Sequence, residues 1–314
     1  MGSDRSVDAL RDRISNWGRW GKDDELGTVN LITESVRRAA GKLVQTGETV
    51  SLALPLNRQG LQRAGDQRLN PQHIMLQTGT DLKAGVQPGQ VGGWGYADDM
   101  VAMALQAATH WDSLAHAFYE YRMYNDRRCD LVTSNGAERN SIDKMSDRIV
   151  TRGVLLDFPL VLGHEHLPMD YRISTTEIEA VLEAAGTEAR PGDILLFRTG
   201  NMKRARANGG WDDYSYTDEP GIGIESLPWL HERDIAAVAC DTWAFECLPG
   251  GSDIWLPVHA AAIVYMGLLI GENFFLDGLA AACERKRRWE FLIAAPPLPF
   301  TKAVGSPVNP LAVF

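Results

Sequence analysis

Short apolar runs bounded by turn residues are the main pattern along this chain. Gly153–Asp157, Asp193–Arg198 and Ile235–Cys240 are brief and almost continuously apolar, which is typical of strands buried on both faces of one sheet. Leu268–Ile270 is a further candidate, and Val50–Leu56 alternates as a half-buried strand does. These runs predict one sheet with several central strands.

Helical patterns are fewer. Glu34–Val44 follows Thr33, a suitable N-cap, and Thr175 or Thr176 opens a second helix over Glu177–Ala185. Because strands outnumber helices and the two are mixed along the chain, we predict an α/β fold with a central mixed, barrel-like sheet flanked by helices.

The segment from Gly60 to Gly95 is rich in Gly, Gln and polar residues, and it predicts a long loop with short strands. A loop of this length inside a compact domain is more often functional than accidental. No repeat, low-complexity tract or clear linker divides the 314 residues. We therefore expect a single domain over residues 1–314.

Composition excludes several classes of protein. With 45% hydrophobic and 23% charged residues the chain is globular, and 31 basic against 41 acidic residues give a net charge of −10. That charge argues against nucleic-acid and anionic-membrane partners. The longest apolar stretch, 260–270, is interrupted by Gly267 and is too short to span a membrane, and the first 20 residues lack the apolar core of a signal peptide. Four cysteines without a CxxC pair indicate reduced thiols in a cytoplasmic protein.

Candidate chemistry is concentrated between Gln106 and His116. In an extended strand, side chains at even spacing share one face, so Gln106, His110 and Asp112 would point the same way. On a helix, Asp112 would point away from His110. An imidazole nitrogen and a carboxylate oxygen suit zinc, manganese or iron, and Gln106 can add a neutral oxygen. The stretch therefore predicts a divalent-metal site, against the alternative of ordinary surface or core histidines.

This stretch resembles the signature of the cyclase family of metal-dependent hydrolases, which includes bacterial kynurenine formamidase and isatin hydrolase. The family pattern is His-x-Gly-Thr-His-x-Asp-x-Pro-x-His. Four positions match it, and three are replaced, by Gln106, Ala108 and Leu114; the matches are Thr109, His110, Asp112 and His116.

The resemblance covers most of the chain. Trp20–Leu31 is similar to the opening of the family's longer members, which marks an N-terminal extension. The later landmarks are Gly153–Asp157, Gly192–Asp193 with Arg198–Gly200, Asp241–Thr242, His259 and Gly271–Asn273.

The resemblance implies a swivelling β/β/α-type fold and hydrolysis of an amide or ester that depends on zinc or manganese. It implies that Gln106, His110 and Asp112 hold the first metal. His259 and Glu272 would complete a second metal position, or would support the site if a single metal binds. His116 would transfer protons, a role that a histidine with a near-neutral pKa can fill.

The expected activity is the opening of a small cyclic ester or amide, such as a lactone, by metal-activated water, with a homo-oligomer acting on a small-molecule substrate. The weaker ligand Gln106 and the long loop favour a ring over N-formylkynurenine, and Arg63, Arg68 or Arg198 could neutralise a substrate carboxylate. The alternatives are an arylformamidase, a metal-dependent lyase or dehydratase, and a non-catalytic binding protein.

Overall fold

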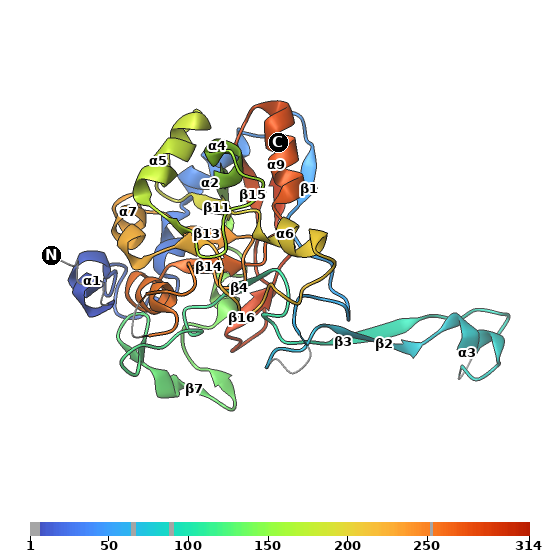
Figure 1. Ribbon diagram of the computed structural model, residues 1–314. Coiled ribbons are helices and arrows are strands. Elements are labelled where there is room, and N and C mark those ends of the chain that lie inside the picture. The colour runs from blue at the N-terminus through green and yellow to red at the C-terminus, as the bar shows by residue number, and fades with distance from the viewer. Residues whose placement is uncertain (1–6, 64–66, 88–90, 252–253) are drawn as a thin grey trace.

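The computed structural model describes residues 7–63, 67–87, 91–251 and 254–314. Within them, nine strands form one mixed sheet that curls as a half-barrel beside a set of helices (Figure 1), which confirms the predicted α/β class. In spatial order the strands are β1 (Thr49–Ser51), β17 (Leu311–Val313), β15 (Glu290–Ala294), β9 (Val150–Asp157), β11 (Ile194–Arg198), β13 (Ala237–Cys240), β14 (Leu269–Glu272), β4 (His110–Asp112) and β16 (Gly305–Pro307).

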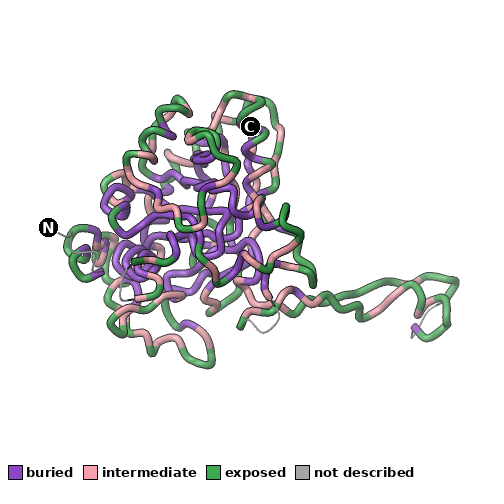
Figure 2. Tube along the Cα trace, in the orientation of Figure 1, coloured by how far each residue is buried: buried purple, intermediate pink, exposed green. Residues whose placement is uncertain are grey.

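The centre of the sheet is parallel. Strands β9, β11, β13 and β14 run side by side, with Leu195 of β11 opposite Val154 of β9 and Val238 of β13. All residues of β11, β13 and β14 are buried (Figure 2), which explains why these strands are continuously apolar in the sequence. Strand β1 is shorter than the predicted Val50–Leu56, because the Leu54 amide leaves the ladder and donates to Thr109 Oγ1 over 2.8 Å.

The two predicted helices begin at side chains that cap them. Thr33 Oγ1 accepts from the Val36 amide at the start of α2 (Glu34–Gly41), as predicted. The cap of α5 (Thr175–Ala184) is Ser174 rather than Thr175 or Thr176, because Ser174 forms a reciprocal capping box with Glu177. The other described helices are α1 (Val7–Ile14), η1 (Gly27–Leu31), α4 (Phe158–Leu162), α6 (Asn201–Ala207), α7 (Leu227–Glu232), α8 (Pro257–His259), the π-helix η5 (Ala260–Met266), α9 (Asp277–Lys286) and the short turns η2 (Cys129–Leu131), η3 (Ile142–Met145) and η4 (Ile224–Ser226).

In the described ranges, no helix is both long enough and apolar enough to cross a membrane.

An arm leaves the body of the protein at the position of the predicted long loop (Figure 1). It consists of β2 (Gln72–Gln77) and β3 (Asp98–Ala102), paired antiparallel, with α3 (Gly79–Lys83) at its tip. Most of the arm is exposed to solvent (Figure 2). Three further two-stranded ribbons are β5 (Arg122–Met123) with β6 (Arg127–Arg128), β7 (Val132–Thr133) with β8 (Gly136–Ala137), and β10 (Arg172–Ile173) with β12 (Gly221–Ile222).

Candidate metal centre

The candidate centre is built on β4, which is paired along both edges. His110 lies opposite Glu272 of β14 and Pro307 of β16, and Asp112 lies opposite Gly305. Alternation along the strand sends His110 and Asp112 to one face. Glu272 is the cross-strand neighbour of His110, so it projects from the same face.

Trp111 anchors the opposite face of β4. Its indole is fully buried, donates from Nε1 to the Ala295 carbonyl over 2.9 Å and meets the Phe274 ring edge-on at 5.1 Å. A Cβ at Gly271 would come within 2.6 Å of this indole, so the adjacent strand carries glycine there. Trp111 therefore belongs to the core, and its side chain points away from the ligands.

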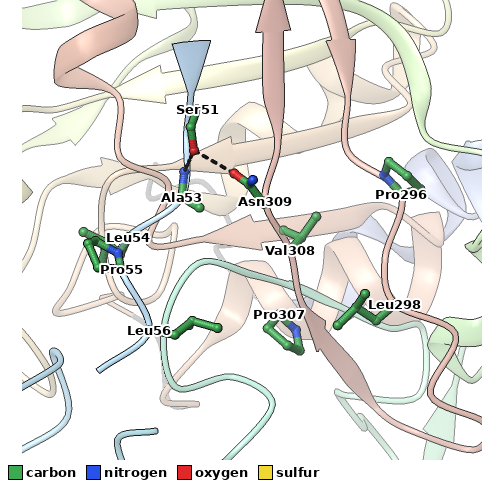
Figure 3. A pocket seen from close by; sticks show the side chains of 10 residues that line it. All are labelled: Ser51, Ala53, Leu54, Pro55, Leu56, Pro296, Leu298, Pro307, Val308 and Asn309. Atoms are coloured by element: carbon green, nitrogen blue, oxygen red, sulfur yellow. Dashed lines mark hydrogen bonds between the residues drawn. The ribbon is translucent and has the colours of Figure 1, made fainter. Parts of the chain in front are cut away.

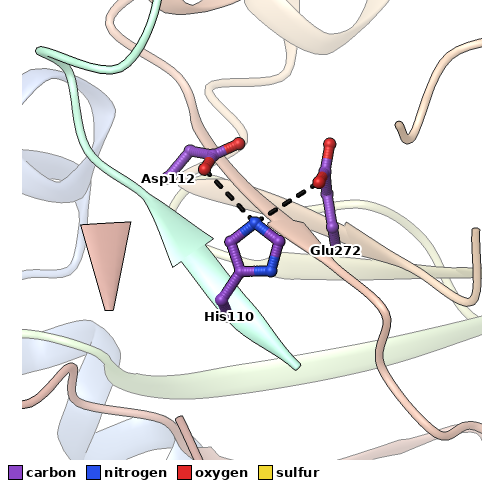
Figure 4. Close-up of side chains that lie close together, drawn as sticks. All are labelled: His110, Asp112 and Glu272. Carbon is purple, nitrogen blue, oxygen red and sulfur yellow. Dashed lines mark ion pairs between the residues drawn. The ribbon is translucent and has the colours of Figure 1, made fainter. Parts of the chain in front are cut away.

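Three buried side chains converge on the other face (Figure 4). His110 Nε2 lies 3.3 Å from Asp112 Oδ1 and 3.3 Å from Glu272 Oε2. Together they offer one nitrogen and two carboxylate oxygens within 4.8 Å of one another. This is a donor set that divalent zinc or manganese accepts.

The hydrogen bond of His110 to the backbone directs its Nε2 atom at the two carboxylates. His110 Nδ1 lies 2.7 Å from the Ala108 carbonyl, which can only accept, so the ring proton belongs on Nδ1 and the lone pair on Nε2. Within the described residues, His110 Nε2 and both carboxylate oxygens of Asp112 are buried and have no hydrogen-bond partner. The two carboxylates bring negative charge to Nε2, so this nitrogen binds either a proton or a cation that lies among the three groups, and the residues fit a divalent metal.

The electrostatics of the cluster favour a cation in the same way. Burial alone lowers the pKa of His110, but the carboxylates of Asp112 and Glu272 outweigh it and raise that pKa to about 9. Burial raises the pKa of Asp112, whereas the imidazoles of His116, His110 and His259 hold it well below its usual range. Asp112 is therefore a carboxylate at neutral pH.

His259 approaches the cluster from α8. Its Nε2 lies 3.0 Å from Glu272 Oε1 and 3.9 Å from Asp112 Oδ2. Its Nδ1 lies 2.7 Å from Glu246 Oε1. Glu246 also accepts the backbone amides of Val258 and His259, and it is fully buried. Glu246 orients His259, and sequence reasoning missed it because nothing in the motif points to a residue 13 positions earlier.

His116 lies just outside the ligand cluster. Its Nε2 is 3.7 Å from Asp112 Oδ1, and its side chain is 23% exposed, in contrast to the buried ligands. Burial lowers its pKa, and Arg68 and His259 lower it further, against the opposing effect of Asp112. A neutral imidazole at the accessible edge of the cluster is suitable for moving a proton.

Gln106 is not part of strand β4. The chain turns between Ala104 and Ala107, whose backbone groups are hydrogen-bonded, and the strand begins at His110. The even-spacing argument for Gln106 is therefore wrong, since it requires an extended chain. Its side chain instead packs at β16, where a Cβ on Gly305 would come within 2.4 Å of the amide nitrogen. Its place as a metal ligand stays a prediction.

One of the three candidate arginines reaches the centre. Arg68 Nη1 lies 3.9 Å from Glu272 Oε2 and hydrogen-bonds the Gln106 carbonyl at 3.4 Å. Arg198 is instead a structural residue, ion-paired to Asp157 and Asp277 in the core. The loop histidine His73 pairs with Asp99 on the exposed arm.

A separate cavity of about 450 Å³ lies between the chain after β1 and the chain around β16 (Figure 3). Leu54, Leu56, Leu298 and Val308 give it an apolar wall, and no acidic, basic or histidine side chain is among its described lining residues. It offers no chemistry to a reaction at His110 and Asp112.

Comparison with known proteins places this arrangement in a family. The family model Cyclase, described as "Putative cyclase", matches residues 50–247. A crystal structure of a novel cyclase shares 35% identity and a TM-score of 0.87, covering 97% of this chain and 99% of that chain. The comparison with curated proteins gives no match.

More distant structures share the fold. Isatin hydrolase A from Ralstonia solanacearum has 18% identity and a TM-score of 0.63, covering 89% of this chain and 97% of that chain. A predicted metal-dependent hydrolase from Bacillus stearothermophilus has 15% identity and a TM-score of 0.52, covering 85% and 98%. The family match and the 35% identical structure establish that this chain belongs to the Cyclase family.

Proposed function

We propose that the protein is a metal-dependent hydrolase that opens a small cyclic ester or amide. The observation that carries this proposal is the buried cluster of His110, Asp112 and Glu272, whose lone pairs face one another without a hydrogen-bond partner on His110 Nε2 or Asp112. The distant structural relatives named as hydrolases support the same class.

The residues divide the chemistry between them. His110, Asp112 and Glu272 would hold a zinc or manganese ion, with His259 as a further nitrogen ligand or a neighbour of a second ion. A divalent metal supplies Lewis-acid activation of water and of the scissile carbonyl. His116 accepts the proton of the attacking water and delivers it to the leaving oxygen or nitrogen.

A ring-shaped substrate is favoured over an acyclic formamide by Gln106, since a carboxamide is a weaker metal ligand than the imidazole of the family pattern. A more open metal would bind the substrate carbonyl directly. The experiment compares a lactone, an isatin-like cyclic amide and N-formylkynurenine with zinc-loaded and manganese-loaded protein. The highest kcat/KM is expected for a ring, and a wide preference for N-formylkynurenine would assign an arylformamidase instead.

A lyase or dehydratase on the same scaffold is distinguished by isotope labelling. Hydrolysis in ¹⁸O-water places the label in the product carboxylate, whereas elimination does not. Protein that never binds a divalent metal, even after reloading, would favour a non-catalytic binding protein.

We also propose that the protein assembles as a homo-oligomer through the arm. Ile74, Leu76 and Val101 are 41%, 54% and 53% exposed, although they belong to an apolar ribbon. A two-stranded ribbon is marginally stable alone in water, and exposed apolar patches mark interaction surfaces. A second copy of the chain would cover these side chains.

The four cysteines are free thiols, as predicted. Three of them are buried, namely Cys240, Cys247 and Cys283. We propose a cytoplasmic location on this basis, because secreted proteins more often pair their cysteines. Cell fractionation would test it.

A further inference from the structure

A polar cavity of about 410 Å³ lies next to the metal centre, at the base of the arm, and arginines dominate its charge. Arg58, Arg63 and Arg68 line it, whereas Asp212 is its single acidic residue among those described. This is a local reversal of sign in a chain whose net charge is −10. A cationic cavity beside a reaction centre raises the local concentration of anionic ligands.

Arg68 connects this cavity to the reaction centre. The same guanidinium that lines the cavity lies 3.9 Å from Glu272 Oε2, and its side chain is 20% exposed. A group bound to Arg68 is therefore close to the candidate metal ligands. The described lining of the apolar cavity between β1 and β16 includes none of the residues of the centre.

The geometry of Arg68 leaves donors for a ligand. Its guanidinium lies over the Trp243 ring at 5.4 Å from the centroid, which orients the plane of the fork. Within the described part of the chain, its one hydrogen bond is from Nη1 to the Gln106 carbonyl, at a long 3.4 Å. Nε and Nη2 remain available, and an arginine fork matches the two oxygens of a carboxylate.

We propose that this cavity binds a carboxylate carried by the substrate, with Arg68 as the residue that contacts it. The proposal rests on the proposed hydrolase function and specifies its substrate class: a ring whose scissile carbonyl is accompanied by a carboxylate substituent. Arg58 and Arg63 add positive charge farther from Glu272. Arg58 is held at this rim by donating to the His73 carbonyl over 2.8 Å.

The experiment compares a lactone that bears a carboxylate with its neutral carboxamide analogue. The wild-type protein should prefer the carboxylate at least tenfold in kcat/KM, and Arg68→Gln should reduce that preference to near one. Arg68→Lys, which keeps the charge but loses the fork, should fall between them. Arg285→Gln is the matched control. Arg285 belongs to helix α9 and pairs with Glu48, so this variant should keep the wild-type preference for the carboxylate.

A binding measurement separates this proposal from the proposed function. Calorimetry on metal-free protein measures the affinity for maleate and, as a control ligand, for its uncharged diamide. The wild type should bind maleate at least tenfold more tightly than R68Q does. If maleate binds but neither lactone is hydrolysed, carboxylate binding by the cavity stands and the proposed hydrolase function is wrong. If both lactones are hydrolysed equally and R68Q does not weaken maleate binding, carboxylate binding by this cavity is wrong, whereas the proposed hydrolase function stands.

Discussion

Glu246 holds the imidazole of His259 by its Nδ1 atom, with 2.7 Å between Nδ1 and Oε1. That contact turns Nε2 toward Glu272 and Asp112. Burial lowers the pKa of His259, but the two glutamates raise it well above its ordinary value. Glu246 therefore orients the imidazole, and the negative charge of the two glutamates favours a proton or a metal cation at its Nε2 atom.

Replacing Glu246 by Gln is expected to weaken metal binding about 10- to 100-fold, the range typical when a residue that orients a ligand is lost. Competition with a chelating dye measures the affinity. Glu219→Gln is the matched control, since Glu219 is also buried and accepts the amides of Trp243 and Ala244, but it orients no histidine. Equal metal affinity in E246Q and wild type would remove this role.

His110→Ala and Asp112→Ala are each expected to abolish bound metal and turnover, because each removes a ligand atom from a buried cluster. Metal analysis of protein purified without chelator gives the content. His164→Ala, a change at an exposed position, should retain both. Full metal content in the two cluster variants would contradict the site.

His116→Ala is expected to keep its metal and to lose about a hundredfold or more in kcat, the usual scale of general acid–base catalysis. The reason is its position beyond the cluster, 3.7 Å from Asp112 and partly exposed. Metal analysis and steady-state kinetics on one preparation test both halves. Near-normal turnover would refute the proton-transfer role, and loss of metal would make His116 a ligand.

Asp241 is expected to make stability fall as pH rises from about 4 to 6. Burial raises its pKa from 3.8 to about 6, against the opposing hydrogen bonds from Thr199 and the charge of Arg198. The unfolded carboxyl thus loses its proton first, and the folded state binds more protons in this window. The stability present below pH 3.8 is lost by the time the pH passes 6, about 3 kcal/mol in all.

Urea unfolding of metal-free protein from pH 3.5 to 7 measures this linkage. The variant Asp241→Asn keeps the side chain polar and cannot titrate. The free energy of unfolding of the wild type minus that of D241N should therefore fall as the pH rises. A difference that stays constant with pH would show that Asp241 does not titrate there.

Paired substitutions on the arm are expected to shift the protein toward monomer. Ile74 lies opposite Met100 on the same face of the ribbon, and both are exposed. Ile74→Asp with Met100→Asp places charge where a second copy would pack, so light scattering should report a lower mass. Lys83→Glu, on the arm's helix α3 (Gly79–Lys83), is the control for charge alone. An unchanged mass would locate assembly elsewhere.

Local pattern was sufficient to predict the parts of the site that belong to short, regular elements. His110 and Asp112 share a face because β4 is extended, whereas the place of Glu272 in the site came from the family resemblance. Gln106 was wrongly predicted to share the face of His110, because the chain turns before the strand. Residue spacing does not reveal the hydrogen bond between Ala104 and Ala107 that forms this turn.

The remaining features depend on contacts between distant segments. Glu246 accepts the backbone amides of Val258 and His259 and contacts the His259 ring, and Arg68 reaches Glu272 from a polar stretch more than 200 residues away. The arm was predicted only as a long loop with short strands, because its strands are exposed on both faces, which removes the alternation that reveals a half-buried strand. Only the assembled fold brings these residues together.

Strand β4 has one further consequence, which concerns the order of folding and metal uptake. Its backbone is fixed by β14 and β16, Trp111 is locked in the core, and the Ala108 carbonyl fixes the ring of His110. The conformational entropy of gathering the ligands is thus lost when the chain folds, before any ion arrives. The apoprotein should therefore keep its native circular dichroism, and restored metal should bind in a single step without a refolding phase.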